Sequence, residues 1–139
     1  MKKTVEKLLK NKDKTVPILS FPSTQCLGIT VNELISSSDM QLKGMMAIAQ
    51  RCNIGACLNM MDLPVEAECF GASIRISENE NPTVEKGIID DISMASDIKV
   101  PNVGSGRTSI FIDGVKKNKQ EIKNIPVFCG VIGPYSLAG

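Results

Sequence analysis

The chain has 139 residues, one ordinary domain's length, and its 16 basic and 15 acidic residues nearly cancel. This balance gives no general attraction to nucleic acid or to an anionic membrane surface. The chain has no histidine, which excludes a histidine general base, a Ser-His-Asp triad and a histidine-ligated metal site within it. No apolar run is long enough for a membrane span or a signal peptide, so the sequence predicts a soluble, cytoplasmic protein.

The cysteines give no sign of a metal or redox site. Metal-binding cysteines usually occur in close pairs, and the sequence has no C-x-x-C. The number of cysteines is odd, and each lies in an apolar or helical context. We therefore expect buried, reduced thiols at Cys26, Cys52, Cys57, Cys69 and Cys129.

The first third of the chain reads as a helix, a strand and a second helix. Apolar residues at helical spacing among lysines predict an amphipathic helix at residues 3–11. The apolar run Val16–Phe21, followed by a proline, predicts a buried strand. Thr30 and Glu33 fit the T-x-x-E capping box, which predicts a short helix through Ile35.

A longer helix and a second strand follow. Asp39 is the expected cap of this helix. Its apolar face favours core packing over a cofactor site and consists of Leu42, Met45, Met46, Ile48 and Ala49. The run Ala56–Met61 predicts a second buried strand, with Asp62 just past its end. Pro64 fits the first turn of the next helix, and Gly71 fits its end.

The remaining pattern predicts a hairpin, two helices and a third strand. Alternation at residues 73–76 and turn residues at 79–82 indicate a hairpin around 73–85. Residues 88–98 carry a weak helical signal, and residues 108–122 carry a stronger one with a lysine-rich, solvated face. The run Val127–Val131 predicts the third buried strand.

The repeated order of apolar strand, loop and amphipathic helix is typical of βαβ units. It predicts an α/β fold with parallel strands that are covered on both faces. Three such units are fewer than a complete eight-stranded α/β barrel needs, since that fold takes about 250 residues. We therefore expect residues 1–14 to form an N-terminal helix and residues 15–139 to form part of a (β/α)₈ barrel.

Ligands of parallel α/β proteins bind where the strands end, which makes Asp62 the first candidate site residue. A carboxylate there can accept hydrogen bonds from a ligand or hold a proton. The alternative is that Asp62 caps the following helix. Glu66 and Glu68 lie near the N-terminus of that helix, where the helix dipole alone explains them. The glycine loop VGSGRTS (103–109) lacks both phosphate-binding spacings and reads as an ordinary loop.

Three segments together resemble the uroporphyrinogen decarboxylase superfamily. MDLPVEAECFGASI (61–74) resembles the segment of its second strand, and FCGVIGPYSLAG (128–139) resembles its G-x-x-G-P-aromatic segment. GSGRTSIFIDGVKKNK (104–119) between them is similar to the helix before the third strand. The resemblance covers about residues 15–139 and implies the N-terminal portion of the family's (β/α)₈ barrel.

The superfamily has two main branches, and the resemblance implies different chemistry for each. One branch decarboxylates the acetate arms of uroporphyrinogen without a cofactor. The other contains corrinoid-dependent methylcobamide:coenzyme M methyltransferases, in which a zinc-bound thiolate attacks a cobalt-bound methyl group. The run VEAE (65–68) is more similar to the methyltransferase branch. The arginine-rich loop that holds carboxylates in the decarboxylases reads FPSTQCLG (21–28) here, without an arginine.

The resemblance implies roles for particular residues. Asp62 matches the key aspartate of the decarboxylases and becomes the expected catalytic residue; with Glu66 and Tyr135 it forms the expected substrate-binding set. Tyr135 matches the aromatic position after Gly-Pro, where packing is the expected role. Zinc and a corrinoid are implied for a complete enzyme only, because the zinc ligands belong to its C-terminal half. Cys26 has no partner ligand and is not assigned to a metal.

These features predict the N-terminal portion of a corrinoid methyltransferase-like enzyme, inactive by itself. The expected partners are a corrinoid protein or a tetrapyrrole-type ligand, with neither nucleic acid nor membrane. Two alternatives remain open: a uroporphyrinogen decarboxylase, and a non-catalytic binding module. Such a module would bury its uncovered apolar face by self-association or against a C-terminal half.

Overall fold

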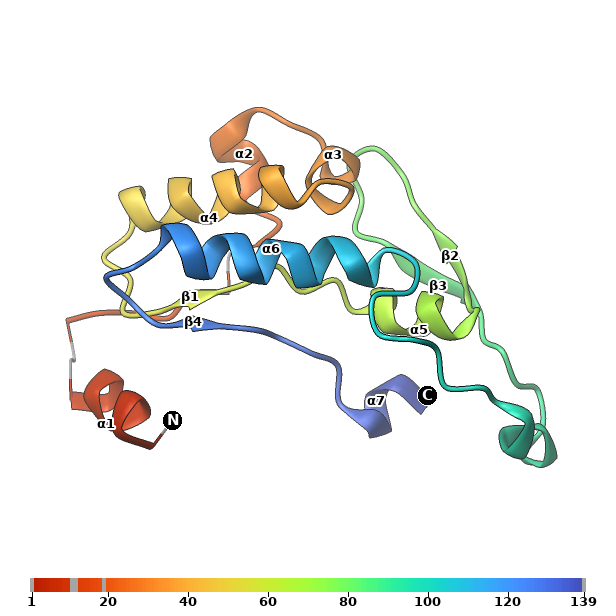
Figure 1. The fold of residues 1–139 in the computed structure, drawn as a ribbon. Coiled ribbons are helices and arrows are strands. Elements are labelled where there is room, and N and C mark those ends of the chain that lie inside the picture. The colour runs from red at the N-terminus through yellow and green to blue at the C-terminus, as the bar shows by residue number, and fades with distance from the viewer. Residues whose placement is uncertain (1, 11–12, 19, 139) are drawn as a thin grey trace.

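A computed structural model describes residues 2–10, 13–18 and 20–138 of the chain. Two short strands, β1 (Cys57–Leu58) and β4 (Val127–Phe128), form a parallel pair in which Cys57 lies beside Val127 and Leu58 beside Phe128. The long helices α4 (Ser38–Arg51) and α6 (Thr108–Glu121) lie side by side over one face of this pair (Figure 1). The predicted α/β fold with parallel strands is confirmed.

The first predicted strand, Val16–Phe21, is wrong. Thr15 makes an isolated parallel bridge with Ile54, and residues 16–18 that follow are irregular. Val16 is 44% exposed and Ile18 is 69% exposed, while Leu19 lies outside the described residues. Pro17 has no N–H to donate to a ladder. The apolar composition of this run indicated burial throughout, but Val16 and Ile18 are uncovered, and only its end is covered, where Ser20 is buried and Phe21 packs against the core.

The other two strands are shorter than predicted. Within Ala56–Met61 only β1 is regular strand, although Ala56, Cys57 and Met60 are buried as expected. Within Val127–Val131 only β4 is strand, its two residues are half-buried, and Val131 is exposed. The expectation that both faces of every strand are covered is therefore wrong for β4.

Two of the first three helices follow the local sequence signals. Helix α1 (Lys2–Lys10) occupies the predicted N-terminal position, and residue 11 lies outside the described residues. A short helix α2 (Ser23–Leu27) was not predicted. Helix α3 (Val31–Ile35) has the complete capping box, because the Thr30 hydroxyl accepts from the Glu33 N–H and the Glu33 carboxylate accepts from the Thr30 N–H. The capping-box prediction is confirmed.

Helix α4 begins earlier than predicted, and Asp39 is not its cap. Ser37 takes the N-cap position, and its hydroxyl accepts from the Met40 N–H. Asp39 lies in the first turn and pairs with Lys117 Nζ at 2.7 Å. Ser37, two residues earlier, caps the helix instead, since serine and aspartate are nearly equally favourable at the N-cap position.

The face that α4 buries is also shifted from the prediction. Met45 and Ile48 are buried as expected, but Met46 is 39% exposed. Gln41 and Gly44 complete the buried face. A hydrophobicity pattern misses both, because one is polar and the other has no side chain.

Two glycines allow the helices to approach closely. A Cβ atom at Gly44 would lie 2.6 Å from the Ser23 hydroxyl oxygen and 3.0 Å from the Ser23 Cβ. A Cβ atom at Gly114 would lie 2.5 Å from the side-chain oxygen of Gln41. These positions hold α2 against α4 and α4 against α6.

The hydrophobic core joins α3, α6 and the segment that follows β1. Its buried side chains are those of Val31, Leu34, Ile35, Met60, Val65 and Phe111. A buried polar contact joins the end of β1 to α6. The Asn118 side-chain amide donates to the Asn59 side-chain oxygen, and both residues are fully buried. These contacts fix α6 over the end of β1.

Helix α6 confirms the predicted helix at residues 108–122, with one exception on its lysine-rich face. Lys116 and Lys119 are exposed as expected. Lys117 Nζ instead lies 2.7 Å from Asp39 and 3.2 Å from Asp113, and it donates to the Ser38 hydroxyl. Lys117 thus links α6 to the first turn of α4.

The segment between β1 and α6 confirms most of the predicted order. Helix α5 (Pro64–Phe70) begins with its proline and ends at Gly71, whose φ of 107° is left-handed. Strands β2 (Ser73–Arg75) and β3 (Thr83–Lys86) form the predicted antiparallel hairpin. The weak helical signal at 88–98 corresponds to a 3₁₀ helix, η1 (Ile92–Asp97).

The chain ends in the short helix α7 (Pro134–Ala138). Tyr135 in this helix is 90% exposed, so the prediction that its ring packs is wrong within the described chain. Among the five free cysteines Cys57 is buried, Cys129 is exposed and the other three are half-buried, which corrects the expectation of five buried thiols. No helix in the described ranges is long and apolar enough to span a membrane.

Candidate active site at the end of β1

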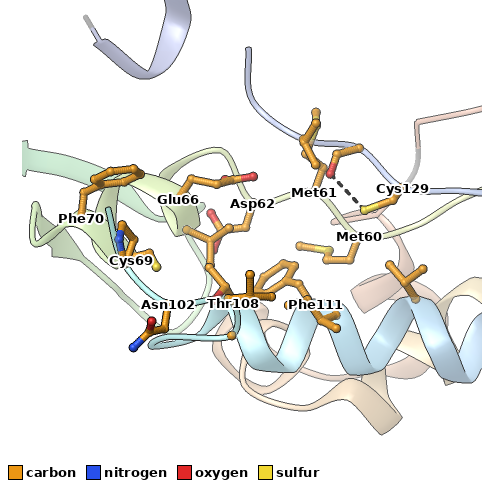
Figure 2. Close-up of a pocket in the computed structure, with 18 of the residues that line it drawn as sticks. Met60, Met61, Asp62, Glu66, Cys69, Phe70, Asn102, Thr108, Phe111 and Cys129 are labelled. Atoms are coloured by element: carbon orange, nitrogen blue, oxygen red, sulfur yellow. Dashed lines mark hydrogen bonds between the residues drawn. The ribbon is translucent and has the colours of Figure 1, made fainter. Parts of the chain in front are cut away.

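A pocket of about 530 Å³ opens beyond the ends of β1 and β4 (Figure 2). This volume lies within the range of small-molecule sites, and most of the lining is apolar. Helices α5 and α6 and the loop at residues 100–104 form its walls. The polar and sulfur-bearing groups that reach it include Asp62, Glu66, Cys69, Thr108, Lys116 and Cys129.

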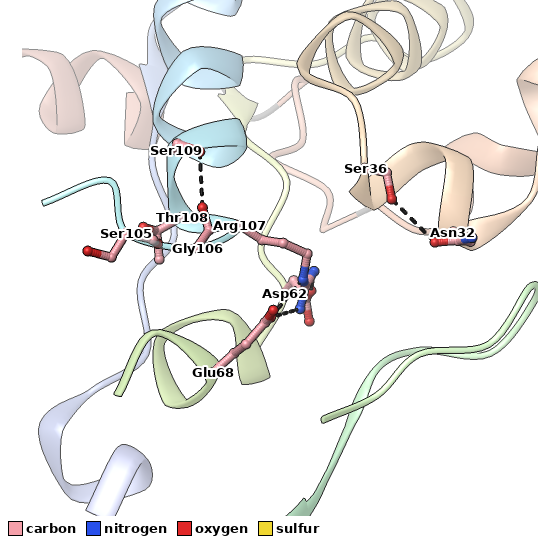
Figure 3. A network of polar contacts seen from close by, with 9 residues as sticks. All are labelled: Asn32, Ser36, Asp62, Glu68, Ser105, Gly106, Arg107, Thr108 and Ser109. Carbon is pink, nitrogen blue, oxygen red and sulfur yellow. Dashed lines mark hydrogen bonds and ion pairs between the residues drawn. The ribbon is translucent and has the colours of Figure 1, made fainter. Parts of the chain in front are cut away.

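Asp62 is the buried carboxylate of this pocket, with 1% of its side chain exposed. Its Oδ2 atom accepts a hydrogen bond of 2.6 Å from Nη1 of Arg107, the residue just before α6 (Figure 3). Its Oδ1 atom is buried and has no hydrogen-bond partner among the described residues. Asp62 therefore has one oxygen engaged by an ion pair and one buried oxygen without a hydrogen-bond partner in the described part of the chain.

Arg107 also binds Glu68 of α5. Its Nε atom donates to Glu68 Oε2 at 2.7 Å, and its Nη2 atom lies 2.5 Å from the same oxygen. The arginine side chain is 13% exposed and that of Glu68 is 28% exposed. One guanidinium thus joins the end of β1 to α5 through two short, charge-assisted contacts.

The glycine loop places Arg107 at this position. Gly104 and Gly106 have φ values of 84° and 56°, in the left-handed region that suits glycine. The Ser109 hydroxyl then donates to the Gly106 carbonyl at 3.0 Å, which joins the loop to the first turn of α6. The loop sets the direction of α6 and of the arginine side chain before it.

Burial and charge act in opposite directions on Asp62. Burial raises the pKa of its carboxyl group above the ordinary value, and the hydrogen bond and charge of Arg107 oppose that rise. Glu68 and Glu66 raise it further by like-charge repulsion. Burial also lowers the pKa of the Arg107 guanidinium, but its bonds to Glu68 and Asp62 outweigh this effect and raise the pKa. Arg107 therefore stays charged.

The structure tests one of the two interpretations of Asp62, that it caps the following helix. The N-cap position of α5 is occupied by Leu63, and no side chain caps that helix. The Asp62 contact with this turn is through its backbone carbonyl, which accepts from the Val65 N–H. The capping interpretation is therefore wrong.

The expected site residues are only partly brought together. Glu66 reaches the same pocket as Asp62, and its Oε1 atom is 3.5 Å from the Ile132 N–H. Tyr135 is exposed on α7 and does not line the pocket. In the sequence, the helix dipole alone accounted for the position of Glu68, but in the structure Glu68 has a specific partner in Arg107.

Sequence reasoning missed Arg107. The arginine after the glycine loop was visible, but its two carboxylate partners lie 39 and 45 residues away along the chain. No local pattern connects positions at such separations. Residues 21–28 contain no arginine, and the arginine of this site, Arg107, comes instead from the position directly before α6.

The residues of this chain do not fit zinc. The chain has no histidine, and no group of three metal-ligating side chains lies together in the described part. Arg107 forms ion pairs with two of the carboxylates beside the pocket, those of Asp62 and Glu68. The pocket itself is open and mostly apolar, and Asp62 and Glu66 are the carboxylates that line it.

A profile of the uroporphyrinogen decarboxylase (URO-D) family matches residues 3–139. The chain therefore belongs to this family. Among solved structures the fold is similar to that of a methyltransferase from Methanosarcina mazei, with a TM-score of 0.73 and 19% sequence identity. The match covers 91% of this chain and 37% of the methyltransferase chain, so this chain spans just over a third of that protein. No curated protein is matched by the sequence.

Proposed function

We propose that this chain is the N-terminal portion of a corrinoid-dependent methyltransferase that transfers a methyl group to a thiol. In this proposal β1 and β4 belong to an incomplete (β/α)₈ barrel, and the pocket beyond them is part of its mouth. A bound corrinoid supplies the methyl group as an electrophile. The chain's own residues would bind and orient the ligand, and the chain alone would not turn over.

One observation supports methyl transfer over decarboxylation. The guanidinium of Arg107 at the mouth is already engaged by Asp62 and Glu68, and Glu66 adds a third carboxylate. A substrate rich in carboxylates needs free arginines and would meet net negative charge here. A neutral ligand with N–H groups would instead find two acceptor side chains beside an apolar wall.

Within this proposal Asp62 is the ligand-binding carboxylate. Its buried Oδ1 atom has no protein donor in the described chain, and such an atom gains a full hydrogen bond when a ligand supplies one. Glu66, half-buried on the same wall, is the second acceptor. Tyr135 stays a proposed contact only for a ligand large enough to extend beyond the pocket to α7.

Decarboxylation remains the second candidate, because the family profile is that of a uroporphyrinogen decarboxylase and Asp62 is placed at the mouth. The two candidates differ in the charge of the ligand. A decarboxylase site must attract a polycarboxylate tetrapyrrole, whereas the methyltransferase site must bind a corrin ring with amide arms.

Ligand titrations distinguish the two functions. The purified chain is titrated by calorimetry with methylcobalamin and, separately, with uroporphyrin I, and D62N is compared with E85Q on exposed β3. We expect methylcobalamin to bind more tightly than uroporphyrin, D62N to weaken it at least fivefold and E85Q to leave it unchanged. Tighter binding of uroporphyrin would favour the decarboxylase. Demethylation of methylcobalamin by this chain with an added thiol would refute its inactivity in isolation.

A further inference from the structure

Arg107 has contacts that a surface arginine does not make. Its guanidinium is largely buried and lies against two carboxylates from different elements, Asp62 after β1 and Glu68 on α5. Arg107 therefore fixes the spacing between the end of β1 and the helix that follows it.

The contact with Asp62 also fixes the orientation of a carboxylate that can otherwise rotate. The 2.6 Å bond from Nη1 engages Oδ2 and leaves Oδ1 without a partner in the described residues. Glu68 holds the other edge of the guanidinium through Nε, so the arginine has little freedom to follow Asp62 into a second rotamer. Lysine could supply the charge but not this two-edged contact, because its donors lie on one atom.

The groups that face Asp62 come from each wall of the pocket. Arg107 approaches from the start of α6, and Glu66 and Glu68 approach from α5. Lys116 of α6 lines the same pocket, as do the thiols of Cys69 and Cys129. Arg107 is the cation that hydrogen-bonds Asp62, so its removal leaves a buried acid near two other acids.

We propose that Arg107 is a positioning residue, which keeps the Asp62 carboxylate ionised and turned so that its Oδ1 atom is the acceptor for a ligand in the pocket. The inference rests on the proposed function for the identity of that ligand. It does not depend on which of the two reactions the family member performs. The predicted consequence is a large change in the titration of Asp62 when the guanidinium is removed.

The test follows the side-chain carboxyl signal of Asp62 by ¹³C NMR during a pH titration, with D62N used to assign the signal. The variants are R107Q, R107K and, as a matched control, R75Q. Arg75 is exposed on β2, and among the described residues its side chain hydrogen-bonds only to the Thr83 hydroxyl. Circular dichroism at each pH shows whether a variant remains folded.

We expect R107Q to raise the titration midpoint of Asp62 by at least about one pH unit. An adjacent opposite charge lowers the pKa of a carboxyl group by about one to three units, and R107Q removes that charge. R107K should give a smaller rise, and R75Q none. A midpoint in R107Q equal to that of the wild type overturns the proposal. If R107Q does not fold, R107K decides: a raised midpoint supports the positioning role, and an unchanged one refutes it.

This outcome is separable from that of the proposed function. The titration uses neither a corrinoid nor turnover. A raised midpoint together with no methylcobalamin binding would keep the positioning role and reject the methyltransferase assignment. An unchanged midpoint together with methylcobalamin binding that D62N weakens would reject the positioning role and keep the methyltransferase assignment.

Discussion

At the scale of single residues, burial and Arg107 together set the ionisation of Asp62. Its burial disfavours the charged form, while Arg107 favours it. The balance leaves the folded-state pKa above the ordinary value for an aspartate. A group of this kind binds more protons in the folded state than in the unfolded state, so it couples folding to pH.

The sign of that coupling gives a prediction for D62N. The contribution of Asp62 to stability is fully present below its unfolded pKa and is lost as pH rises through the higher folded pKa. Asparagine does not titrate, so the free energy of unfolding of the wild type minus that of D62N should fall between pH 3 and pH 7. The fall amounts to about 1.4 kcal/mol for each unit by which the folded pKa exceeds the unfolded one.

Urea unfolding followed by circular dichroism at several pH values measures this difference. D90N serves as the control and should give a nearly constant difference, because Asp90 is exposed and its side chain makes no hydrogen bond within the described residues. A wild-type advantage over D62N that grows toward neutral pH would mean that Arg107 more than compensates for burial, and would reverse the assigned direction.

At the scale of elements, close helix packing through glycine decides the position of α6 and hence of Arg107. Ser23 lies against Gly44, and Gln41 of the same helix lies against Gly114. Through these two contacts α2 packs against α4, and α4 packs against α6 (Figure 1). Because α6 begins directly after Arg107, its placement on α4 brings the guanidinium to Asp62.

We predict that G44A destabilises the protein by about 1 kcal/mol or more. Alanine gains up to about 1 kcal/mol over glycine in a helix, but overpacking a buried contact costs about 1–3 kcal/mol. The new Cβ would lie 3.0 Å from the Ser23 Cβ, which rotation of the serine hydroxyl cannot relieve. The midpoint of urea unfolding measures the effect.

Gly87 is the matched control for this substitution. It lies outside the helices, has nothing within 4 Å of an added Cβ and does not have a positive φ. G87A should therefore leave stability unchanged or slightly raised. Equal unfolding midpoints for G44A and the wild type would show that α2 moves away from α4 without cost.

At the scale of the whole molecule, the described chain leaves many apolar side chains uncovered. Ile18, Val131 and Tyr135 are all exposed, and the first two belong to runs whose composition predicts buried strands. A soluble monomer rarely carries large contiguous apolar surface. These exposed side chains are available for contact with a second copy of the chain.

We predict that the isolated chain binds an apolar dye such as ANS and self-associates as concentration rises. I18K and V131K should each reduce both effects, because a lysine interrupts the apolar surface. I92K, at a still more exposed isoleucine on η1, should leave association unchanged. Sedimentation velocity gives the mass, and a monomer with no dye binding at all concentrations would contradict the prediction.

Local patterns predicted the helices and the direction of the strands well. The Thr30–Glu33 box, Pro64 with Gly71, and the periodicity of residues 108–122 each depend on neighbours within a few positions, and the structure confirms them. The strand at 16–21 and the packing of Tyr135 were wrong, because composition reports hydrophobicity and does not report whether another layer is present. The shifted cap of α4 shows the same limit at short range, since Ser37 and Asp39 compete for one role.

The sequence by itself placed Asp62 at the end of a mostly buried apolar segment, because the run Ala56–Met61 stops at that acid, although the regular strand already ends at Leu58. It also determined the family, whose motifs are read in linear order. Only the tertiary structure decided what Asp62 does there, since its partner Arg107 arrives from a helix 45 residues later. A charge pair of this kind depends on how α6 packs on α4, and packing is set by side-chain shape across the layer rather than by any pattern along the chain.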